Sequence, residues 1–164
     1  EMSASLVGSE MCIRDRGKDY TVLIDYSHTP DSLENILRAV RGFCTGRIIA
    51  VFGCGGDRDP FKRPVMGKIA AELSDLAIVT SDNPRTEDPY KILRQILAGM
   101  QDTETPYEVI ESRVSAIGRA MELAQKDDVI VLCGKGHETY QEIGHEKHHL
   151  DEREVVASYL EANA

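Results

Sequence analysis

The chain has 164 residues, of which 41% are hydrophobic and 29% charged, a composition that suits a globular domain with a sizeable core. Its formal net charge of −9 argues against a nucleic-acid partner, because phosphate backbones attract basic surfaces. No apolar run approaches the roughly 20 residues of a membrane-spanning helix, so membrane insertion is not expected.

Residues 1–16 are expected to lie outside the fold. Their sequence shows neither helical nor strand periodicity, and it lacks the basic start and long apolar centre of a signal peptide. The segment resembles translated sequencing-adaptor read-through. We therefore predict a non-native or disordered leader at 1–16 and one domain at 17–164, whose natural chain continues upstream of residue 17.

From residue 20 onward, short apolar runs alternate with segments of helical period. In chain order the prediction is strand 20–26, helix 32–43, strand 47–52, helix 64–73, strand 75–80, helix 90–100, short edge strand 107–110, helix 114–125, strand 128–133, a hairpin of 140–143 and 147–150, and helix 151–160. Asp151 and Glu154 form a predicted capping box for the last helix. This alternation predicts a single α/β domain with a Rossmann-like, mostly parallel twisted sheet, helices on both faces and a C-terminal hairpin.

Polar loops follow four of the predicted strands at the points where the strands end. They are residues 25–28, 53–59, 82–85 and 134–138. In a parallel sheet all four loops emerge at the carboxyl edge, where open α/β folds bind their ligands. Their charged side chains are therefore predicted to converge on one crevice, although they lie far apart in the sequence.

The loop at 82–85 offers a carboxylate, an amide and a guanidinium beside a proline of fixed φ. The planar fork of Arg85 suits a carboxylate, and Arg58 offers a second donor of this kind for a carboxylate or a phosphate. Glu138 is a candidate acceptor for an ammonium group. Such a set suits a small charged amino acid better than a base or a lipid. Each loop also has a plain structural interpretation, as a turn or a helix cap, and spacing alone gives the two about equal weight.

The glycine-rich loops match known phosphate-binding motifs only in part. The loop at 53–56 is followed by no GK[ST] and lacks the third glycine of GxGxxG, and the loop at 134–138 also lacks the Walker spacing. Asp25, at the end of a strand, is a candidate contact for ribose hydroxyls. His28 is a candidate base or nucleotide contact, although a histidine in such a loop is more often a plain hydrogen-bonding residue.

The cysteines and the histidine cluster point to no further chemistry. Cys44, Cys54 and Cys133 lie in or beside apolar runs and are interpreted as small core residues in a reducing cytosol, with a disulfide pair left open. The histidines at 145, 148 and 149 match no zinc pattern, so no metal site is predicted.

Four segments together resemble the C-terminal domain of the Mur ligases, and more narrowly of those that add 2,6-diaminopimelate. The segments are DYSHTPDSLENIL at 25–37, VFGCGGDRDPFKRPVMG at 51–67, VTSDNPRTEDP at 79–89 and GKGHETYQ at 134–141. Each is weak alone, but in this order and at these separations they are highly specific. The resemblance covers nearly the whole chain from about residue 17 to residue 164.

The resemblance implies a cytoplasmic, three-domain ligase of peptidoglycan synthesis. In that family ATP, with Mg²⁺, phosphorylates the D-glutamyl carboxylate of UDP-N-acetylmuramoyl-L-alanyl-D-glutamate, and the amine of meso-diaminopimelate attacks the acyl phosphate. The resemblance assigns no catalytic residue within this chain. It assigns meso-diaminopimelate binding to Arg58, Asp82, Asn83, Pro84, Arg85, Gly134 and Glu138, and the nucleotide side of the cleft to Asp25 and His28.

The chain also departs from the family pattern. The Walker-type phosphate loop, the carbamylated lysine and the nucleotide-sugar site belong to the first two domains of the family, and none is present in this sequence. The resemblance therefore implies that this chain holds the acceptor amino-acid site and half of the ATP cleft, while ATP and Mg²⁺ bind mainly to the missing central domain. We expect the chain to fold alone, as a monomer, without turning over.

Two alternatives are left open. The first is a lysine-adding Mur ligase or a folylpolyglutamate synthetase, which shares an Asp-x-x-His-x-Pro element like residues 25–30. Arg85 and the loop around Arg58 argue against both, because the lysine-adding relatives carry a different residue in place of this arginine. The second is a stand-alone, non-catalytic module that binds a nucleotide or an amino acid.

Overall fold

The computed structural model describes residues 9–15 and 18–163. The elements, in chain order, are β1 (Ser9–Asp15), β2 (Lys18–Asp25), α1 (Pro30–Arg41), β3 (Ile48–Phe52), α2 (Lys62–Leu73), β4 (Leu76–Val79), α3 (Pro89–Leu97), the 3-10 helix η1 (Ala98–Met100), β5 (Tyr107–Val109), α4 (Arg113–Leu123), β6 (Val129–Cys133), β7 (Tyr140–Ile143), β8 (Glu146–His149) and α5 (Glu152–Ala162). From β2 onward this is the predicted order.

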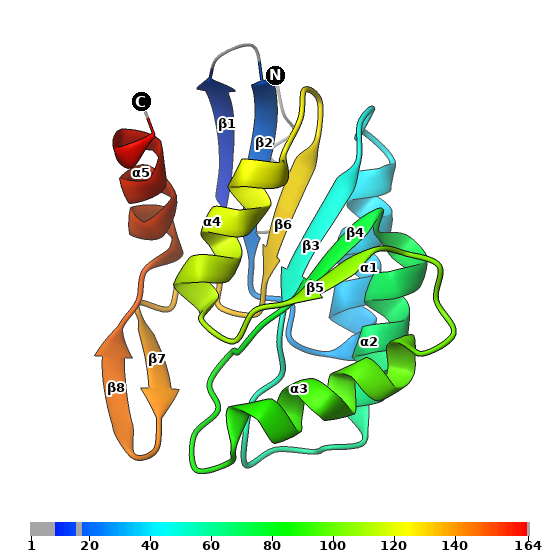
Figure 1. The fold of residues 1–164 in the computed structure, drawn as a ribbon, viewed down its shortest axis with the longest axis vertical. Coiled ribbons are helices and arrows are strands. Elements are labelled where there is room, and N and C mark those ends of the chain that lie inside the picture. The colour runs from blue at the N-terminus through cyan, green and yellow to red at the C-terminus, as the bar shows by residue number, and fades with distance from the viewer. Residues whose placement is uncertain (1–8, 16–17, 164) are drawn as a thin grey trace.

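Six strands form one sheet in the order β1-β2-β6-β3-β4-β5 (Figure 1). The strands from β2 to β6 run parallel, and β1 pairs antiparallel with β2. Every residue of β3 and β6 is buried, as expected for apolar central strands that are covered on both faces. The predicted mostly parallel sheet is confirmed, and β5 lies at its edge as expected.

Strand β1 falls within the segment that the sequence analysis placed outside the fold. Its backbone pairs with β2 from Ser9 opposite Ile24 to Asp15 opposite Lys18, whereas residues 1–8, 16 and 17 lie outside the described residues. Strand pairing uses backbone groups that every sequence carries, so the lack of side-chain periodicity did not exclude it. The sheet begins before residue 17, while the non-native origin of residues 1–16 stays a prediction.

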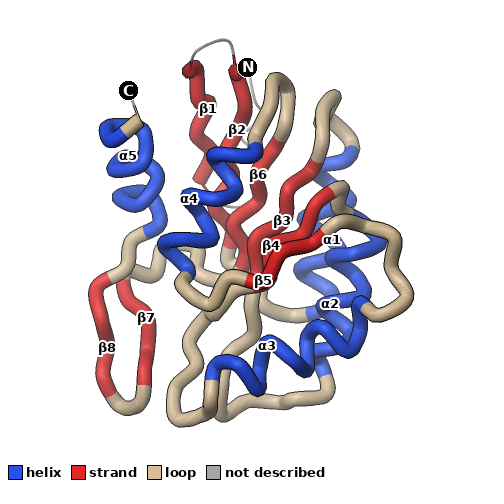
Figure 2. Tube along the Cα trace, in the orientation of Figure 1, coloured by secondary structure: helices blue, strands red, loops and turns tan. Residues whose placement is uncertain are grey.

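Helices cover both faces of the sheet (Figures 1 and 2). On one face α1, α2 and α3 pack over a core cluster that includes Leu37, Met66 and Ile96. On the other face α4 and α5 pack over a second cluster that includes Ile117 and Val156. The predicted two-sided α/β arrangement is therefore confirmed.

Polar caps determine where several helices begin. The side chain of Thr29 caps α1 in a capping box, and Pro30 follows at the first helical position. Asp151 caps α5 by accepting a hydrogen bond from the backbone N–H of Arg153. The Asp151 half of the predicted capping box is present, but the Glu154 half is wrong. The Glu154 carboxylate pairs with the imidazole of His149 at 2.9 Å instead of with the backbone of Asp151.

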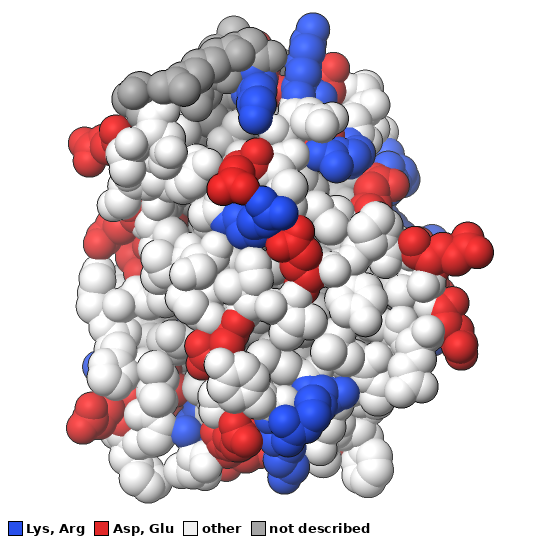
Figure 3. Space-filling model, in the orientation of Figure 1, with Lys and Arg blue, Asp and Glu red and all other residues white. Residues whose placement is uncertain are grey.

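The remaining strands form the predicted hairpin, in which β7 pairs antiparallel with β8. β7 also lies against the loop that follows β4, through a parallel bridge between Arg85 and Ile143. Within the described residues, no helix is long and apolar enough to cross a membrane. On the face drawn in Figure 3, acidic and basic side chains are interspersed and form no continuous basic stripe over the described residues.

Candidate functional site

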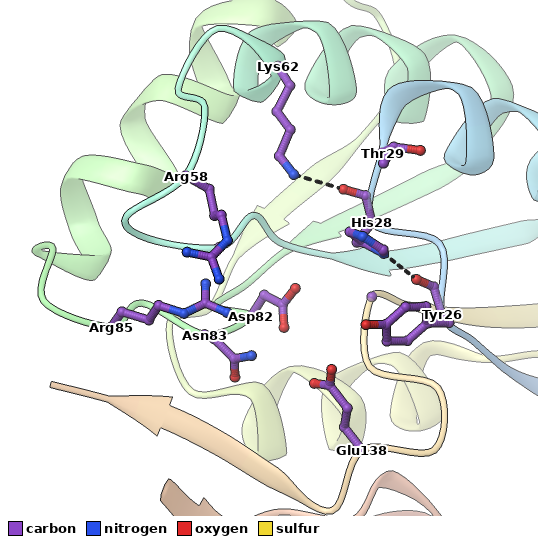
Figure 4. Close-up of a pocket in the computed structure, with 11 residues that line it drawn as sticks. Tyr26, His28, Thr29, Arg58, Lys62, Asp82, Asn83, Arg85 and Glu138 are labelled. Atoms are coloured by element: carbon purple, nitrogen blue, oxygen red, sulfur yellow. Dashed lines mark hydrogen bonds between the residues drawn. The ribbon is translucent and has the colours of Figure 1, made fainter. Parts of the chain in front are cut away.

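Loops at the carboxyl ends of β2, β3, β4 and β6 enclose a cavity of about 370 Å³ (Figure 4). The loops that were predicted to converge therefore do meet. Residues that line the cavity are Tyr26, His28, Thr29, Gly55, Arg58, Lys62, Asp82, Asn83, Arg85, Gly134 and Glu138. Of the residues named from sequence, only Asp25 and Pro84 are not in this lining.

Hydrogen bonds from two other segments hold the loop at 82–85. The Asn83 side-chain oxygen accepts from the Lys135 ammonium group at 2.6 Å and from the backbone N–H of Glu142 at 3.0 Å. The backbone oxygen of Asp82 accepts from the Gln141 side chain at 2.6 Å. The loop is thus positioned by the β6–β7 connection and by β7, which lie more than 50 residues away in sequence.

Arg85 adopts a left-handed backbone conformation, with φ of 51°. This conformation is uncommon for residues other than glycine, so surrounding contacts must hold it. Its N–H donates to the Glu142 carbonyl oxygen at 3.1 Å, and its carbonyl oxygen accepts from the Gly144 N–H at 2.7 Å. Its guanidinium donates to the Gly56 carbonyl oxygen at 3.0 Å and lies 3.6 Å from the Glu142 carboxylate. The hairpin therefore fixes both the backbone and the side chain of Arg85.

The glycine loop after β3 allows this close packing. A Cβ atom on Gly56 would overlap the carbonyl group of Pro84, and one on Gly55 would lie 2.8 Å from the Arg85 guanidinium. The Gly56 N–H also donates to the Asn83 carbonyl oxygen at 2.7 Å. The close backbone approach suggested by the glycines is thus an approach to the 82–85 loop.

Opposite charges line opposite sides of the cavity. Figure 4 shows the guanidinium groups of Arg58 and Arg85 next to each other on one side, and the carboxylate of Glu138 directed inward from the other. Asp82 lies between them. Two forked cations can hold a carboxylate, and carboxylate oxygens can accept from an ammonium group. The cavity therefore has the charge pattern of a zwitterion binding site.

Comparison with known proteins identifies the family of this chain. Residues 11–136 match the family model described as "Mur ligase, glutamate ligase domain". The chain belongs to the Mur ligase family. It is 64% identical over 143 residues to the UDP-N-acetylmuramoyl-L-alanyl-D-glutamate–2,6-diaminopimelate ligase of Trichormus variabilis, covering 87% of this chain and 29% of that protein. It is 50% identical over 151 residues to ligase 1 of the same name from Clostridium acetobutylicum, covering 92% and 31%.

A solved structure leads to the same family. The structure of a UDP-N-acetylmuramoyl-L-alanyl-D-glutamate–2,6-diaminopimelate ligase superposes with a TM-score of 0.88 and 40% sequence identity, over 96% of this chain and 32% of that chain. The chain therefore spans about 30% of the length of the curated relatives it matches.

Tyr26, His28 and Lys62 are linked to one another at the cavity mouth of this Mur ligase domain. The rings of Tyr26 and His28 meet edge to face with centroids 4.7 Å apart, and the His28 imidazole hydrogen-bonds the Tyr26 carbonyl oxygen at 2.9 Å. Lys62 donates to the His28 carbonyl oxygen at 3.0 Å. The negative charge of Glu138, with burial second, raises the pKa of Tyr26. The Tyr26 phenol therefore stays protonated at neutral pH.

A buried arginine supports the glycine loop from below. Arg63 is fully buried and donates to the Gly55 carbonyl oxygen at 2.9 Å and to the Glu87 carboxylate at 2.8 Å. Hydrogen bonds from Arg63 lower the pKa of Glu87 to about 2. The Glu87 carboxylate also accepts from the backbone N–H of Asp57 at 2.6 Å. This network ties α2 and the start of α3 to the loop that carries Arg58.

Asp25 lies behind the cavity and not in its lining. Its side chain is 2% exposed, and its carboxylate accepts from the backbone N–H of Ser27 at 2.9 Å and from the Ser27 hydroxyl. Its other oxygen has no hydrogen-bond partner among the residues that the structure describes. A contact between Asp25 and a ribose stays a prediction, as do the binding roles of the residues in the lining.

Sequence reasoning did not single out four of the lining residues: Tyr26, Thr29, Gly55 and Lys62. All belong to segments that the analysis discussed, but which side chain of a loop faces a cavity depends on the backbone turn. Lys135 was also overlooked as a contact. Its position in a glycine-rich loop gave no sign that its side chain would be fully buried under the 82–85 loop.

Neither the described cysteines nor the hairpin histidines at 145, 148 and 149 are in the cavity lining. Cys44, Cys54 and Cys133 are free thiols, and burial raises the pKa of Cys54 to about 12. No group of three or more His, Cys, Asp or Glu side chains within the described residues is placed to hold a metal ion. For a phosphate group, the donors of Lys62 and His28 at the cavity mouth fit.

Proposed function

We propose that this domain binds meso-diaminopimelate as the acceptor amino acid of a ligase that adds it to UDP-N-acetylmuramoyl-L-alanyl-D-glutamate. One observation carries the proposal: Arg58 and Arg85 face Glu138 across a single cavity, with Asp82 between them. The names of the relatives supply the identity of the amino acid. The charge pattern of the cavity supplies the reason for its recognition.

Diaminopimelate carries a carboxylate and an ammonium group at each end. In the proposed complex the guanidinium groups of Arg58 and Arg85 hold the distal carboxylate, and Glu138 with Asp82 accepts from the distal ammonium group. Asn83 and Gly134 also line the cavity, and Pro84 limits the conformational freedom of the 82–85 loop. The proximal amine then points toward the mouth, where it can act as the nucleophile.

The same arrangement discriminates against lysine. Lysine has no distal carboxylate, so binding it would leave the two guanidinium groups without a partner. A site whose polar groups stay unpaired with the wrong substrate can discriminate by several kcal/mol. Arg85 favours diaminopimelate for this reason.

The activity of the whole ligase is part of the same proposal. A longer protein would bind ATP and Mg²⁺ mainly through a central domain, with Lys62, His28 and Asp25 on the nucleotide side of the cleft. ATP supplies the phosphoryl group that activates the D-glutamyl carboxylate. We further propose that the domain is monomeric and cytoplasmic, and that alone it binds the amino acid without turnover.

The test is isothermal titration calorimetry of the 164-residue chain with meso-diaminopimelate and with lysine. The unaltered chain is expected to bind diaminopimelate more tightly than lysine, and Arg85→Ala is expected to remove most of the difference. Arg38→Ala, an exposed arginine on α1, is the matched control and should keep it. Equal affinities for the two amino acids in the unaltered chain would contradict the proposed function.

A further inference from the structure

One buried cation lies beneath the acidic side of the cavity. Lys135 follows β6 and is fully buried, between Gly134 with φ of 116° and Gly136 with φ of 52°. A Cβ on Gly136 would lie 2.9 Å from the Tyr26 side chain, so the chain passes close to the cavity wall there. A glycine of positive φ on each side of Lys135 turns the chain so that the lysine side chain lies inside the protein.

The Lys135 ammonium group contacts three side chains that line the cavity. Its Nζ lies 2.6 Å from the Asn83 side-chain oxygen, 3.1 Å from Asp82 Oδ1 and 3.6 Å from Glu138 Oε1. These two carboxylate oxygens are themselves buried and receive no hydrogen bond from the part of the chain that the structure describes. The Lys135 ammonium group therefore places a positive charge close to both oxygens.

The net charge of Asp82, Glu138 and Lys135 together suits one cationic group of a ligand. Asp82 and Glu138 would carry −2 between them, and Lys135 reduces the sum to −1. Two carboxylates that share a site without a counter-ion repel each other, and the repulsion favours protonation of one or displacement of both. Lys135 lies between the two carboxylates as their shared counter-ion, and the three groups together match a single ammonium group.

We propose that Lys135 is a positioning and specificity-determining residue of the amino-acid site. It holds Asp82, Asn83 and Glu138 in one arrangement and sets their combined charge, so that the site accepts the distal ammonium group of its substrate. Lys135 does not line the cavity and acts through these three side chains. This inference rests on the proposed function, because it assumes that the acidic side of the cavity binds an amine.

The experiment compares two ligands that differ only in their amines. Meso-diaminopimelate uses both sides of the cavity, whereas pimelate, the same seven-carbon diacid without amines, uses only the arginine side. Dissociation constants of both are measured by NMR titration of the 164-residue chain, of Lys135→Met and of Lys68→Met. Lys68 lies on α2 in an exposed pair with Glu72, so its replacement is the matched control.

We expect Lys135→Met to reduce the ratio of diaminopimelate to pimelate affinity by at least about tenfold, since misplaced charged partners weaken binding by that order. Lys68→Met should leave the ratio unchanged. If Lys135→Met lowers the affinity for both ligands by the same factor, or for neither, the inference is overturned and Lys135 is a purely structural residue. If the unaltered chain binds diaminopimelate no better than pimelate, the proposed function fails instead.

If circular dichroism shows that Lys135→Met does not fold, two further measurements test the inference. Lys135→Gln keeps one N–H donor for Asn83 and should also lower the affinity ratio, and an unchanged ratio would refute the inference. In the unaltered chain, the ¹⁵N signal of the Lys135 ammonium group should shift with diaminopimelate and stay in place with pimelate. A signal that responds to neither ligand would count against the role of Lys135.

Discussion

Arg113 and Glu152 form an ion pair of 2.8 Å in which both side chains are fully buried. The guanidinium also donates to the carbonyl oxygens of Ser81 at 3.2 Å and Cys133 at 2.7 Å. Ser81 lies just after β4 and Cys133 ends β6, so both carbonyl groups are at the points where two of the site loops begin. One side chain of α4 thus connects α5 to both loops.

Replacing Glu152 by alanine is expected to lower the free energy of unfolding by about 3–5 kcal/mol, because the buried guanidinium of Arg113 would lose its counter-charge. Urea denaturation followed by circular dichroism measures the change. Glu34→Ala, which removes the partner of the exposed Arg38, should cost less than about 1 kcal/mol. A similar decrease in the free energy of unfolding for the two variants would show that the buried pair stabilises the fold no more than the exposed one.

Two glycine substitutions separate close packing from backbone strain. Gly56→Ala should destabilise the domain by about 3 kcal/mol, because the new methyl group would overlap Pro84 and displace the 82–85 loop. Gly144 has φ of 63° and open space around it, so Gly144→Ala should cost only about 1 kcal/mol of strain. Thermal unfolding and diaminopimelate binding are the measurements. A Gly56→Ala protein with unaltered binding would contradict the described packing.

Stability should decline in acid as Glu87 becomes protonated. Its pKa in the folded protein is about 2, against an ordinary value of 4.5, so its contribution is complete above pH 4.5 and lost as the pH falls to about 2. Glu87→Gln should therefore flatten the stability profile in this range by about 1 kcal/mol. Glu72→Gln, in an exposed pair on α2, is the control. An unchanged acid slope in Glu87→Gln would refute the assignment.

Arg58 offers a test of binding that does not disturb folding. Arg58 is exposed, and its guanidinium donates to the carbonyl oxygen of the neighbouring Asp57 at 2.9 Å. Arg58→Ala should change stability by less than about 0.5 kcal/mol and weaken diaminopimelate binding at least about tenfold. Calorimetry and urea denaturation give the two values. Unaltered affinity would remove Arg58 from the proposed site.

The alternation of apolar runs was sufficient to predict the fold, because buried parallel strands and amphipathic helices have different periods. The strand predicted at 128–133 is observed as Val129–Cys133, and the edge strand predicted at 107–110 as Tyr107–Val109. The strand at Ser9–Asp15 was not predicted, since its pairing depends on a neighbouring backbone and leaves no pattern in its own side chains.

The meeting of the four loops was predictable for a related reason, because a parallel sheet gathers the carboxyl ends of its strands at one edge. The orientation of individual side chains was not. Asp25 turns toward Ser27 and away from the cavity, whereas the unremarked Lys62 lines it. The burial of Lys135 and the Arg113–Glu152 pair depend on tertiary contacts that no local pattern encodes.

The attachment of Arg85 to the hairpin bears on how the domain can be shortened. The match to the family model ends at residue 136, before both Glu138 and β7. A protein engineer who trimmed the gene to that match would retain every strand of the large sheet from β2 onward. The trimmed product would nevertheless lack Glu142 and Gly144, whose backbone groups hold the left-handed turn at Arg85. Such a product would also lack α5 and the Glu152 partner of the buried Arg113, so it would lose stability as well as the orientation of Arg85.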